Sequence, residues 1–319
     1  MPRYDAAIKQ TVYAIAAANP MSQRRILYVP GKSPKPPAEV HRGLLLRCLV
    51  EGVARHDSVT ADAIGNDEEN FELIAWNHFY YGRHQDITPE LRWIDELLRK
   101  QEASEMDRRE ATTWNKRMVR SLYQIADSFP VIIPWLPETM RKNAEETRRY
   151  FHNQGGVAWD VREFLKRELR EQLKSCNRVL VIGHSLGSII AYDSLWSLSQ
   201  QEQLQGKVDF LTLGSPLGLN YVRERLLGAK ASPDRRYPAM IRNWMNVSAT
   251  GDLISLDRVF ADDYSEMLES GFVRRIDDHC HDLYTWYRND TGLNVHRSYG
   301  YLIHPVVARL ITRWWKVNT

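Results

Sequence analysis

The chain has 319 residues and is 43% hydrophobic, so it can bury a sizeable core and is neither a disordered chain nor a minimal disulfide-stapled fold. Its 43 basic and 40 acidic residues leave a net charge of +3, without the one-sided basic excess that binding along a phosphate backbone requires. We therefore expect no nucleic-acid partner.

Three widely spaced cysteines, Cys48, Cys176 and Cys280, favour free thiols in a reducing compartment. The N-terminal stretch "TVYAIAAANP" at 11–20 faintly resembles the core of a secretory signal peptide, but its apolar run is short and Asp5 precedes it. No apolar stretch approaches the ~20 residues needed to cross a bilayer. The sequence therefore predicts a cytoplasmic protein.

The first part of the chain predicts strand, helix and strand in turn. The apolar run at 24–31 ends in Pro-Gly and predicts a buried strand that enters a loop. Residues 39–55 place apolar side chains on one helical face, and 71–82 predicts a second strand. The highly charged, helix-forming stretch 85–155 shows no clear strand and predicts a helical insertion.

From residue 156 onward strands and helices alternate. Helices are predicted at 158–176, 185–198 and 304–316, strands at 178–183, 207–219 and 241–252, and 271–277 could be a further strand. This alternation predicts the α/β fold class, with a mostly parallel central sheet flanked by helices. The chain then divides into an N-terminal part of the core at 1–84, the helical insertion at 85–155, which could be a cap, and the rest of the core at 156–319.

The sequence "VLVIGHSLGS" at 179–188 sets Gly-His-Ser-Leu-Gly between a predicted strand and a predicted helix. Gly-x-Ser-x-Gly arises by chance in roughly one chain of this length in ten, but these flanks are what a nucleophile elbow needs. Gly183 and Gly187 suit a turn too tight for a Cβ. Ser185 is the candidate nucleophile, and the Leu186 N–H at the helix start a candidate oxyanion donor. The alternative is an ordinary turn with an accidental serine.

A serine hydroxyl is a weak nucleophile without a base, so a histidine and an acid should follow it in the chain. Asp252 lies just after a predicted strand and is the candidate acid. Alternatives nearby are Asp257, Asp262 and Asp263. His296 lies in a loop before the final helix and is the candidate base, whereas His304 precedes Pro305 and should begin that helix.

Together with "FLTLGSPLGL", "NWMNVSATGDLIS" and "NVHRSYGYLIHP", the motif resembles the α/β-hydrolase superfamily in its lipase- and esterase-like branch. The resemblance covers 156–319 and, more weakly, 24–82. It implies a sheet of eight or slightly fewer strands and acyl transfer to water without a cofactor. It also implies that the loop after the first strand supplies a second oxyanion donor, for which the Lys32 N–H is the candidate. Pro30 stands where the family often has histidine.

The resemblance implies a serine hydrolase that cleaves carboxylic esters through Ser185, His296 and Asp252, with a small-molecule or lipid ester as substrate. A thioesterase, an amidase, an acyltransferase on the same triad, or a non-catalytic binding protein of the same fold are alternatives. The stretch "FPVIIPWLP" at 129–137, with Trp114 upstream, could cover an acyl pocket, touch a membrane surface peripherally, or belong to an extra helical subdomain.

Two further patterns carry little weight. "GKS" at 31–33 follows a strand as a phosphate-binding loop does, but Ile26 stands where that motif needs a glycine and "PKPP" prevents the helix. In "DDHCHD" at 277–282, His279 and His281 could share a metal ion on one strand face, with Cys280 between them. No second cluster with ligand spacing exists, so we predict no metal.

Overall fold

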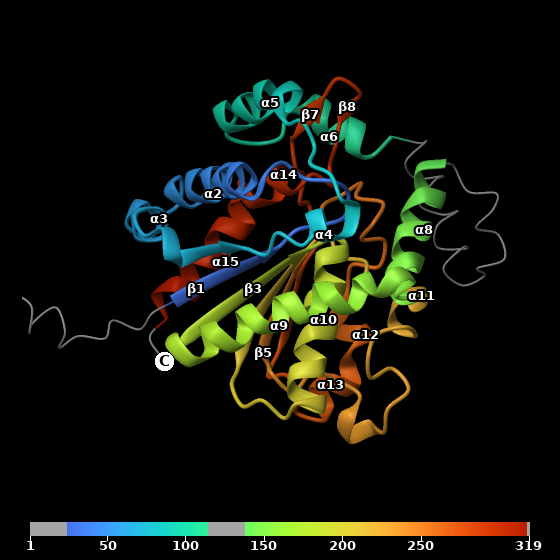
Figure 1. The fold of residues 1–319 in the computed structure, drawn as a ribbon. Helices are drawn as coiled ribbons and strands as arrows, with labels where there is room; N and C mark the ends of the chain where they lie inside the picture. The colour runs from blue at the N-terminus through green and yellow to red at the C-terminus, as the bar shows by residue number, and fades with distance from the viewer. Residues whose placement is uncertain (1–23, 114–137, 318–319) are drawn as a thin grey trace, which may run out of the picture.

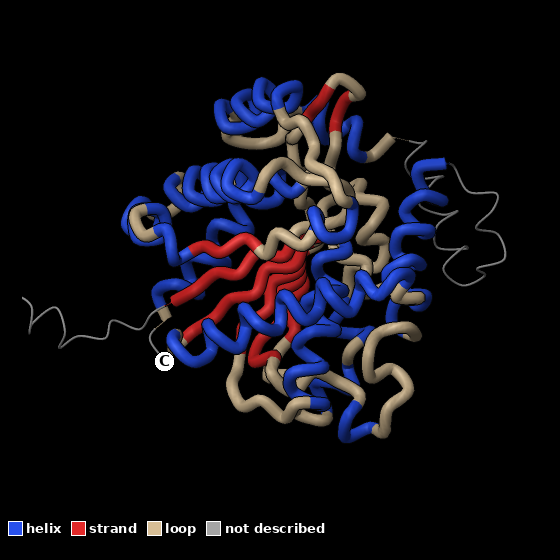
Figure 2. Tube along the Cα trace, viewed as in Figure 1, coloured by secondary structure: helices blue, strands red, loops and turns tan. Residues whose placement is uncertain are grey.

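A six-stranded parallel sheet with helices on both faces forms the centre of the molecule (Figures 1 and 2). The structure, a computed structural model, describes residues 24–113 and 138–317. The strands are β1 (Arg24–Val29), β2 (Phe71–Leu73), β3 (Arg178–His184), β4 (Val208–Leu213), β5 (Ile241–Val247) and β6 (Ile276–His279), in the order β2-β1-β3-β4-β5-β6. Every neighbouring pair is parallel. The predicted α/β fold class is confirmed.

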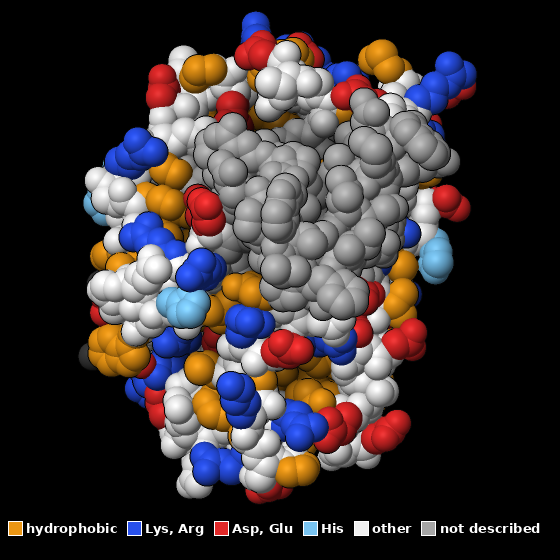
Figure 3. Space-filling view, turned by 90° about the vertical axis from the view of Figure 1, so that its right-hand side faces the viewer, with side chains coloured by type: hydrophobic (Ala, Val, Ile, Leu, Met, Phe, Trp, Pro, Cys, Tyr) orange, Lys and Arg blue, Asp and Glu red, His pale blue; other side chains and the backbone are white. Residues whose placement is uncertain are grey.

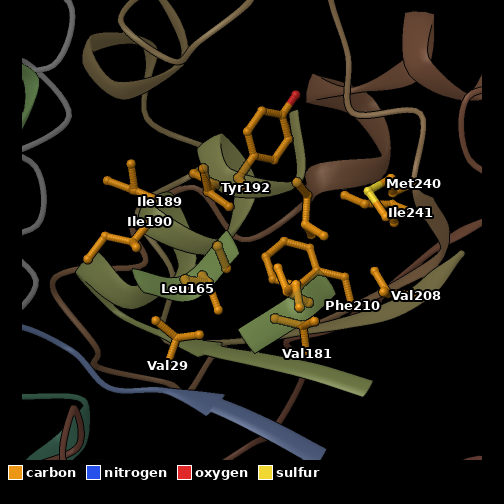
Figure 4. Close-up of a cluster of buried hydrophobic side chains, with 14 of the residues drawn as sticks. Val29, Leu165, Val181, Ile189, Ile190, Tyr192, Val208, Phe210, Met240 and Ile241 are labelled. Carbon is orange, nitrogen blue, oxygen red and sulfur yellow. The ribbon is translucent and has the colours of Figure 1, made fainter. Parts of the chain in front are cut away.

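Alternate residues of the strands face two separate hydrophobic cores. Leu27 and Val181 face a core that includes α9 (Val157–Ser175) and α10 (Leu186–Trp196). Tyr28 and Leu180 face a second core with α2 (Ala38–Ala54), α3 (Ser58–Gly65), α14 (Ser298–Leu302) and α15 (Pro305–Lys316). Figure 4 shows Leu165, Val181 and Ile189 among the buried side chains of the first core. Burial on both faces explains why these strands are almost continuously apolar.

The remaining helices surround this frame. They are α4 (Asn77–Tyr81), α5 (Thr88–Arg99), α6 (Glu105–Ala111), α8 (Glu138–Phe151), α11 (Asn220–Arg223), α12 (Phe260–Asp263) and α13 (Ser265–Glu269). A small antiparallel hairpin, β7 (Arg288–Asn289) and β8 (Gly292–Leu293), lies beside α5 and α6 (Figure 1). No helix in the described ranges is long and apolar enough to cross a membrane.

The prediction of a strand at 71–82 was largely wrong. β2 ends at Leu73, and Asn77–Tyr81 form α4, which Gly82 caps with φ of +64°. The aromatic run suggested a strand, but Trp76 and Tyr80 are four residues apart and pack edge to face at 5.5 Å, a helical spacing. The predicted sixth strand exists, although it begins at Ile276. The hairpin β7–β8 was not predicted.

The described parts of the predicted insertion, α5, α6 and α8, are helical. The stretch 129–137, Trp114 and the N-terminal stretch 11–20 lie outside the described residues. The division at 1–84, 85–155 and 156–319 remains a prediction. On the face that Figure 3 shows, described Lys and Arg side chains are interspersed with Asp and Glu rather than gathered into a patch of one sign.

Candidate active site

Ser185 occupies the sharp turn between β3 and α10. Its φ of +54° and ψ of −128° form a backbone conformation that side-chain-bearing residues rarely adopt, at a cost on the order of 1–3 kcal/mol. Its N–H donates to the Leu213 carbonyl at 3.1 Å, and its carbonyl accepts from the Ser188 N–H at 3.0 Å. The strand and helix predicted around this serine are present, and the backbone bonds on both sides hold the turn.

The two motif glycines are required by close approach. A Cβ on Gly183 would lie 2.6 Å from the Cα of Ser188, in the first turn of α10. A Cβ on Gly187 would lie 2.2 Å from the carbonyl oxygen of Val29 at the end of β1. Both distances are below van der Waals contact, so the elbow fits between its neighbours only with glycine at these positions.

Asp252 and His296 are hydrogen bonded. Asp252 follows β5, its side chain is fully buried, and its Oδ2 lies 2.8 Å from Nδ1 of His296. Oδ2 also accepts from the Tyr301 hydroxyl at 2.6 Å, and Oδ1 accepts from the Ile254 N–H at 2.9 Å. Burial raises the pKa of Asp252, but the charge and hydrogen bonds of these partners, His296 foremost, outweigh it and hold that pKa at about 2. The carboxylate is therefore ionised at neutral pH.

An ionised carboxylate only accepts hydrogen bonds, so Nδ1 of His296 carries the proton in this contact. In the neutral ring the other nitrogen, Nε2, then has its lone pair free to take up a proton. This is the tautomer in which a histidine acts as a general base.

Gly214 lies between Ser185 and this pair. It directly follows Leu213, whose carbonyl accepts from the Ser185 N–H, and it has φ of +52°. A Cβ here would lie 2.7 Å from Oδ2 of Asp252 and 3.1 Å from Nδ1 of His296. The structure thus brings Asp252 and His296 into contact and ties the Ser185 backbone to the strand that flanks them, at the carboxyl edge of the sheet.

His184, which precedes Ser185, was not predicted as a site residue. Its Nε2 lies 2.8 Å from the carbonyl oxygen of His296, and the two rings are 4.8 Å apart between centroids. A carbonyl only accepts, so Nε2 donates. Burial, and then the nearby His296, keeps the pKa of His184 well below its usual value, so the ring is neutral. His184 occupies the variable position between Gly183 and Ser185, so the motif gave no indication of its role. Its hydrogen bond holds the backbone of the loop that carries His296.

The loop after β1 packs against Ser185. A Cβ on Gly31 would lie 2.9 Å from the Cβ of Ser185. Asn77 of α4 donates through Nδ2 to the carbonyls of Gly31 and Ser33, at 2.8 and 2.9 Å. The hydroxyl of Tyr81 accepts from the Ser33 N–H at 2.9 Å. The helix that the sequence presented as a strand therefore anchors this loop, and Asn77 was missed for that reason.

Lys32 and Leu186, the two predicted oxyanion donors, both lie next to this contact. Lys32 directly follows Gly31, and its side chain pairs with Glu146 of α8 at 3.3 Å. Burial lowers the pKa of Lys32 although Glu146 opposes the shift. Leu186 is the first residue of α10, where a backbone N–H has no acceptor within the helix.

The alternative acids have other partners. Asp263 pairs with Arg223 at 2.9 Å, and burial, followed by the neighbouring Asp257, raises the pKa of Asp263 to about 6. Asp257 accepts from the Val259 N–H at 3.4 Å, and Asp262 lies in α12.

His304 begins α15, as expected. Its Nδ1 accepts from the Val306 N–H at 3.2 Å, which caps the helix.

The "DDHCHD" stretch lies around the end of β6, where His279 is the last strand residue. The carbonyl of Cys280 accepts from Arg258 at 3.0 Å. Within residues 24–113 and 138–317, no three His, Cys, Asp or Glu side chains are grouped to hold a metal ion. All three cysteines are free and buried.

Comparison with known protein families, with curated proteins and with solved structures finds no match to this chain. The interpretation of the site therefore depends on its geometry: a strained serine between a strand and a helix, with a buried His-Asp pair at the same sheet edge.

Proposed function

We propose that this protein is a serine hydrolase of the α/β-hydrolase type that cleaves carboxylic esters. The observation that carries the proposal is the hydrogen bond from His296 to the buried, ionised Asp252, beside a serine held at a positive φ. Glycine would adopt this conformation without the steric strain, so serine at this position lowers stability. A use for its hydroxyl would explain why serine is present despite this cost.

In the proposed reaction Ser185 Oγ attacks the ester carbonyl while Nε2 of His296 takes the hydroxyl proton. The tetrahedral intermediate collapses when His296 returns this proton to the leaving alcohol, and the acyl group stays on Ser185. A water molecule, deprotonated by His296, then releases the acid by the same steps. Asp252 keeps His296 in the required tautomer and stabilises its charged form.

The negative oxygen of each tetrahedral intermediate needs fixed donors. The N–H groups of Leu186 and Lys32 are the proposed pair, since Leu186 begins α10 and Lys32 follows the glycine that packs on Ser185. Each such donor is worth about 2.7–4 kcal/mol of transition-state stabilisation in comparable sites.

The test is covalent labelling of the purified protein with a fluorophosphonate, with the adduct located by peptide mass spectrometry. We expect labelling at Ser185 that is lost in Ser185→Ala and in His296→Ala. His304→Ala is the matched control for the base, because His304 caps α15, and it should be labelled like the wild type. The proposal is contradicted if the folded protein is not labelled, or if His296→Ala is labelled like the wild type.

The substrate bond is tested by an ester, a thioester and an amide of one acyl chain, each with water and with an added alcohol as acceptor. Faster turnover of the ester with water supports the proposal. Preference for the thioester, the amide or the alcohol acceptor favours the corresponding alternative. Repeating the ester measurement with longer acyl chains, free and in lipid vesicles, separates a small-molecule ester from a lipid ester at a membrane surface.

A further inference from the structure

Helices α5 and α6 contact the part of the chain that carries His296. The hairpin β7–β8 precedes His296, with β7 in contact with α5 and β8 with α6, and Figure 1 shows it beside these helices at the top of the view, away from β5. The residues of α5 and α6 are about 180 to 210 positions earlier in the sequence than those they contact around His296, so only the fold brings them together. Two sets of contacts join the helices to this part of the chain, and a third joins α6 to the loop that carries Asp252.

The first contact centres on Glu90 of α5. Its Oε2 accepts from the Tyr287 hydroxyl at 2.8 Å and from the guanidinium of Arg297, the residue directly after His296. Both charged side chains of this ion pair are largely buried. Burial disfavours the charged guanidinium, yet Glu90 and its neighbours hold the pKa of Arg297 above its usual value. Arg297 is therefore a cation that pairs with Glu90 and also lies over the rings of Tyr287 and Tyr299.

The second contact joins α6 to the hairpin. Arg288 donates to Oδ1 of Asp107 and to Oε2 of Glu110, both at 2.6 Å, and the side chain of Asp107 is fully buried. The other oxygen of Glu110 accepts from the Leu293 N–H at 2.8 Å. One carboxylate thus bonds both strands of the hairpin.

The third contact joins α6 to the loop that carries Asp252. Gly251 directly precedes Asp252 and has φ of +86°, and a Cβ there would lie 2.3 Å from the carbonyl oxygen of Ala111, the last residue of α6. The end of α6 therefore packs against the turn that presents Asp252. The same short helix touches the acid loop and the hairpin before the histidine.

We propose that the α5–α6 segment, residues 88–111, sets the geometry between His296 and Asp252, with Glu90 and Glu110 as positioning residues. The effect on chemistry rests on the proposed function, whereas the effect on the His-Asp contact does not. A pair held by loops alone can change its geometry, and a misplacement of 1 Å can lower the rate at a catalytic site about 100-fold.

The experiment uses Glu90→Gln and Glu110→Gln, which keep side-chain shape and remove the charge. Glu105→Gln is the matched control, because Glu105 lies on α6 and pairs with Arg109 on the exposed surface. The first readout is the low-field proton NMR signal of the hydrogen between His296 Nδ1 and Asp252, assigned by its loss in His296→Ala. The second is the rate of fluorophosphonate labelling at Ser185, measured with the melting temperature.

We expect the low-field signal to broaden or shift in both Gln variants and the labelling rate to fall between about tenfold and about 100-fold. Glu105→Gln should match the wild type in both readouts. An unchanged signal and labelling rate in Glu90→Gln and Glu110→Gln would overturn the proposal, as would a loss of melting temperature with neither readout altered.

If a Gln variant does not fold, Tyr287→Phe removes a single donor to Glu90 and Arg288→Lys removes the two-pronged contact to α6. Either should reproduce the change in signal. A wild type that shows the low-field signal but is not labelled contradicts the proposed hydrolase and leaves the positioning role to be decided by the signal. A wild type with neither signal nor labelling contradicts both.

Discussion

Tyr301 and Asp252 share one hydrogen bond at the centre of the site. The Tyr301 hydroxyl donates to the same carboxylate oxygen that accepts from His296, and it accepts from the Ala249 N–H at 2.9 Å. One buried phenol thereby orients the acid and closes the turn after β5.

Tyr301→Phe should lower both stability and reactivity. The change leaves the buried Ala249 N–H without its acceptor, at a cost of about 1–3 kcal/mol, and removes one of the hydrogen bonds to Oδ2 of Asp252. We expect a lower free energy of unfolding in urea and slower labelling at Ser185. An unaltered free energy of unfolding would show that these groups find other partners.

The Asp252 carboxylate should make the free energy of unfolding depend on pH in the acidic range. Its pKa of about 2 in the folded state lies below the usual 3.8, so the folded state holds the proton less tightly than the unfolded state does. The resulting stabilisation is present above pH ~4 and is lost as the pH falls toward ~2, by about 2 kcal/mol in total. Urea unfolding across this range should show the loss in the wild type and a smaller one in Asp252→Asn. Parallel pH profiles for the two proteins would contradict the assignment.

Gly187→Ala and Gly43→Ala should have opposite effects. A Cβ at position 187 would collide with the Val29 carbonyl, so we expect marked destabilisation and loss of labelling at Ser185. Gly43, in the middle of α2, has no atom within 4 Å of an added Cβ. Alanine there should stabilise the protein by about 0.5–1 kcal/mol and leave labelling unchanged. Thermal melting and labelling of both variants provide the comparison.

Asp209→Ala should separate stability from chemistry. This buried carboxylate near the start of β4 accepts from Arg178 at 3.2 Å, from Trp314 Nε1 at 2.8 Å and from Asn243 at 2.7 Å. Removing it leaves the buried guanidinium of Arg178 without its opposite charge, at a cost of about 3–5 kcal/mol. We expect a large fall in melting temperature, while the labelling rate per folded molecule at low temperature stays near that of the wild type. A comparable loss of labelling would mean that the two ends of the sheet are coupled.

The sequence predicted best what is determined locally. The strand, turn and helix around Ser185 could be identified because the apolar run, the two glycines and the helix start lie within about twenty residues. Asp252 was identified by its place after β5 and His296 by its place before the last helices, and the structure brings these two into contact.

Features that depend on distant contacts could not be predicted in this way. The hairpin β7–β8 has two residues in each strand, and its partners in α6 come from far earlier in the chain. α4 has the aromatic composition of a strand, and only its packing and the bonds of Asn77 to the loop after β1 show why it is helical. The role of His184 depends on the carbonyl of His296, which no local pattern reveals.

The positive φ of Ser185 opposes stability to the chemistry that we propose for this residue. Glycine would adopt this conformation without penalty, so a mutation to glycine would strengthen the fold while removing the hydroxyl. In a lineage that no longer needed the hydroxyl, nothing would hold serine at this position against such a mutation. On the proposed function, relatives that keep the sheet and the buried acid but lack turnover should therefore be found with glycine at the position of Ser185, and the fold itself would be the more stable for the exchange.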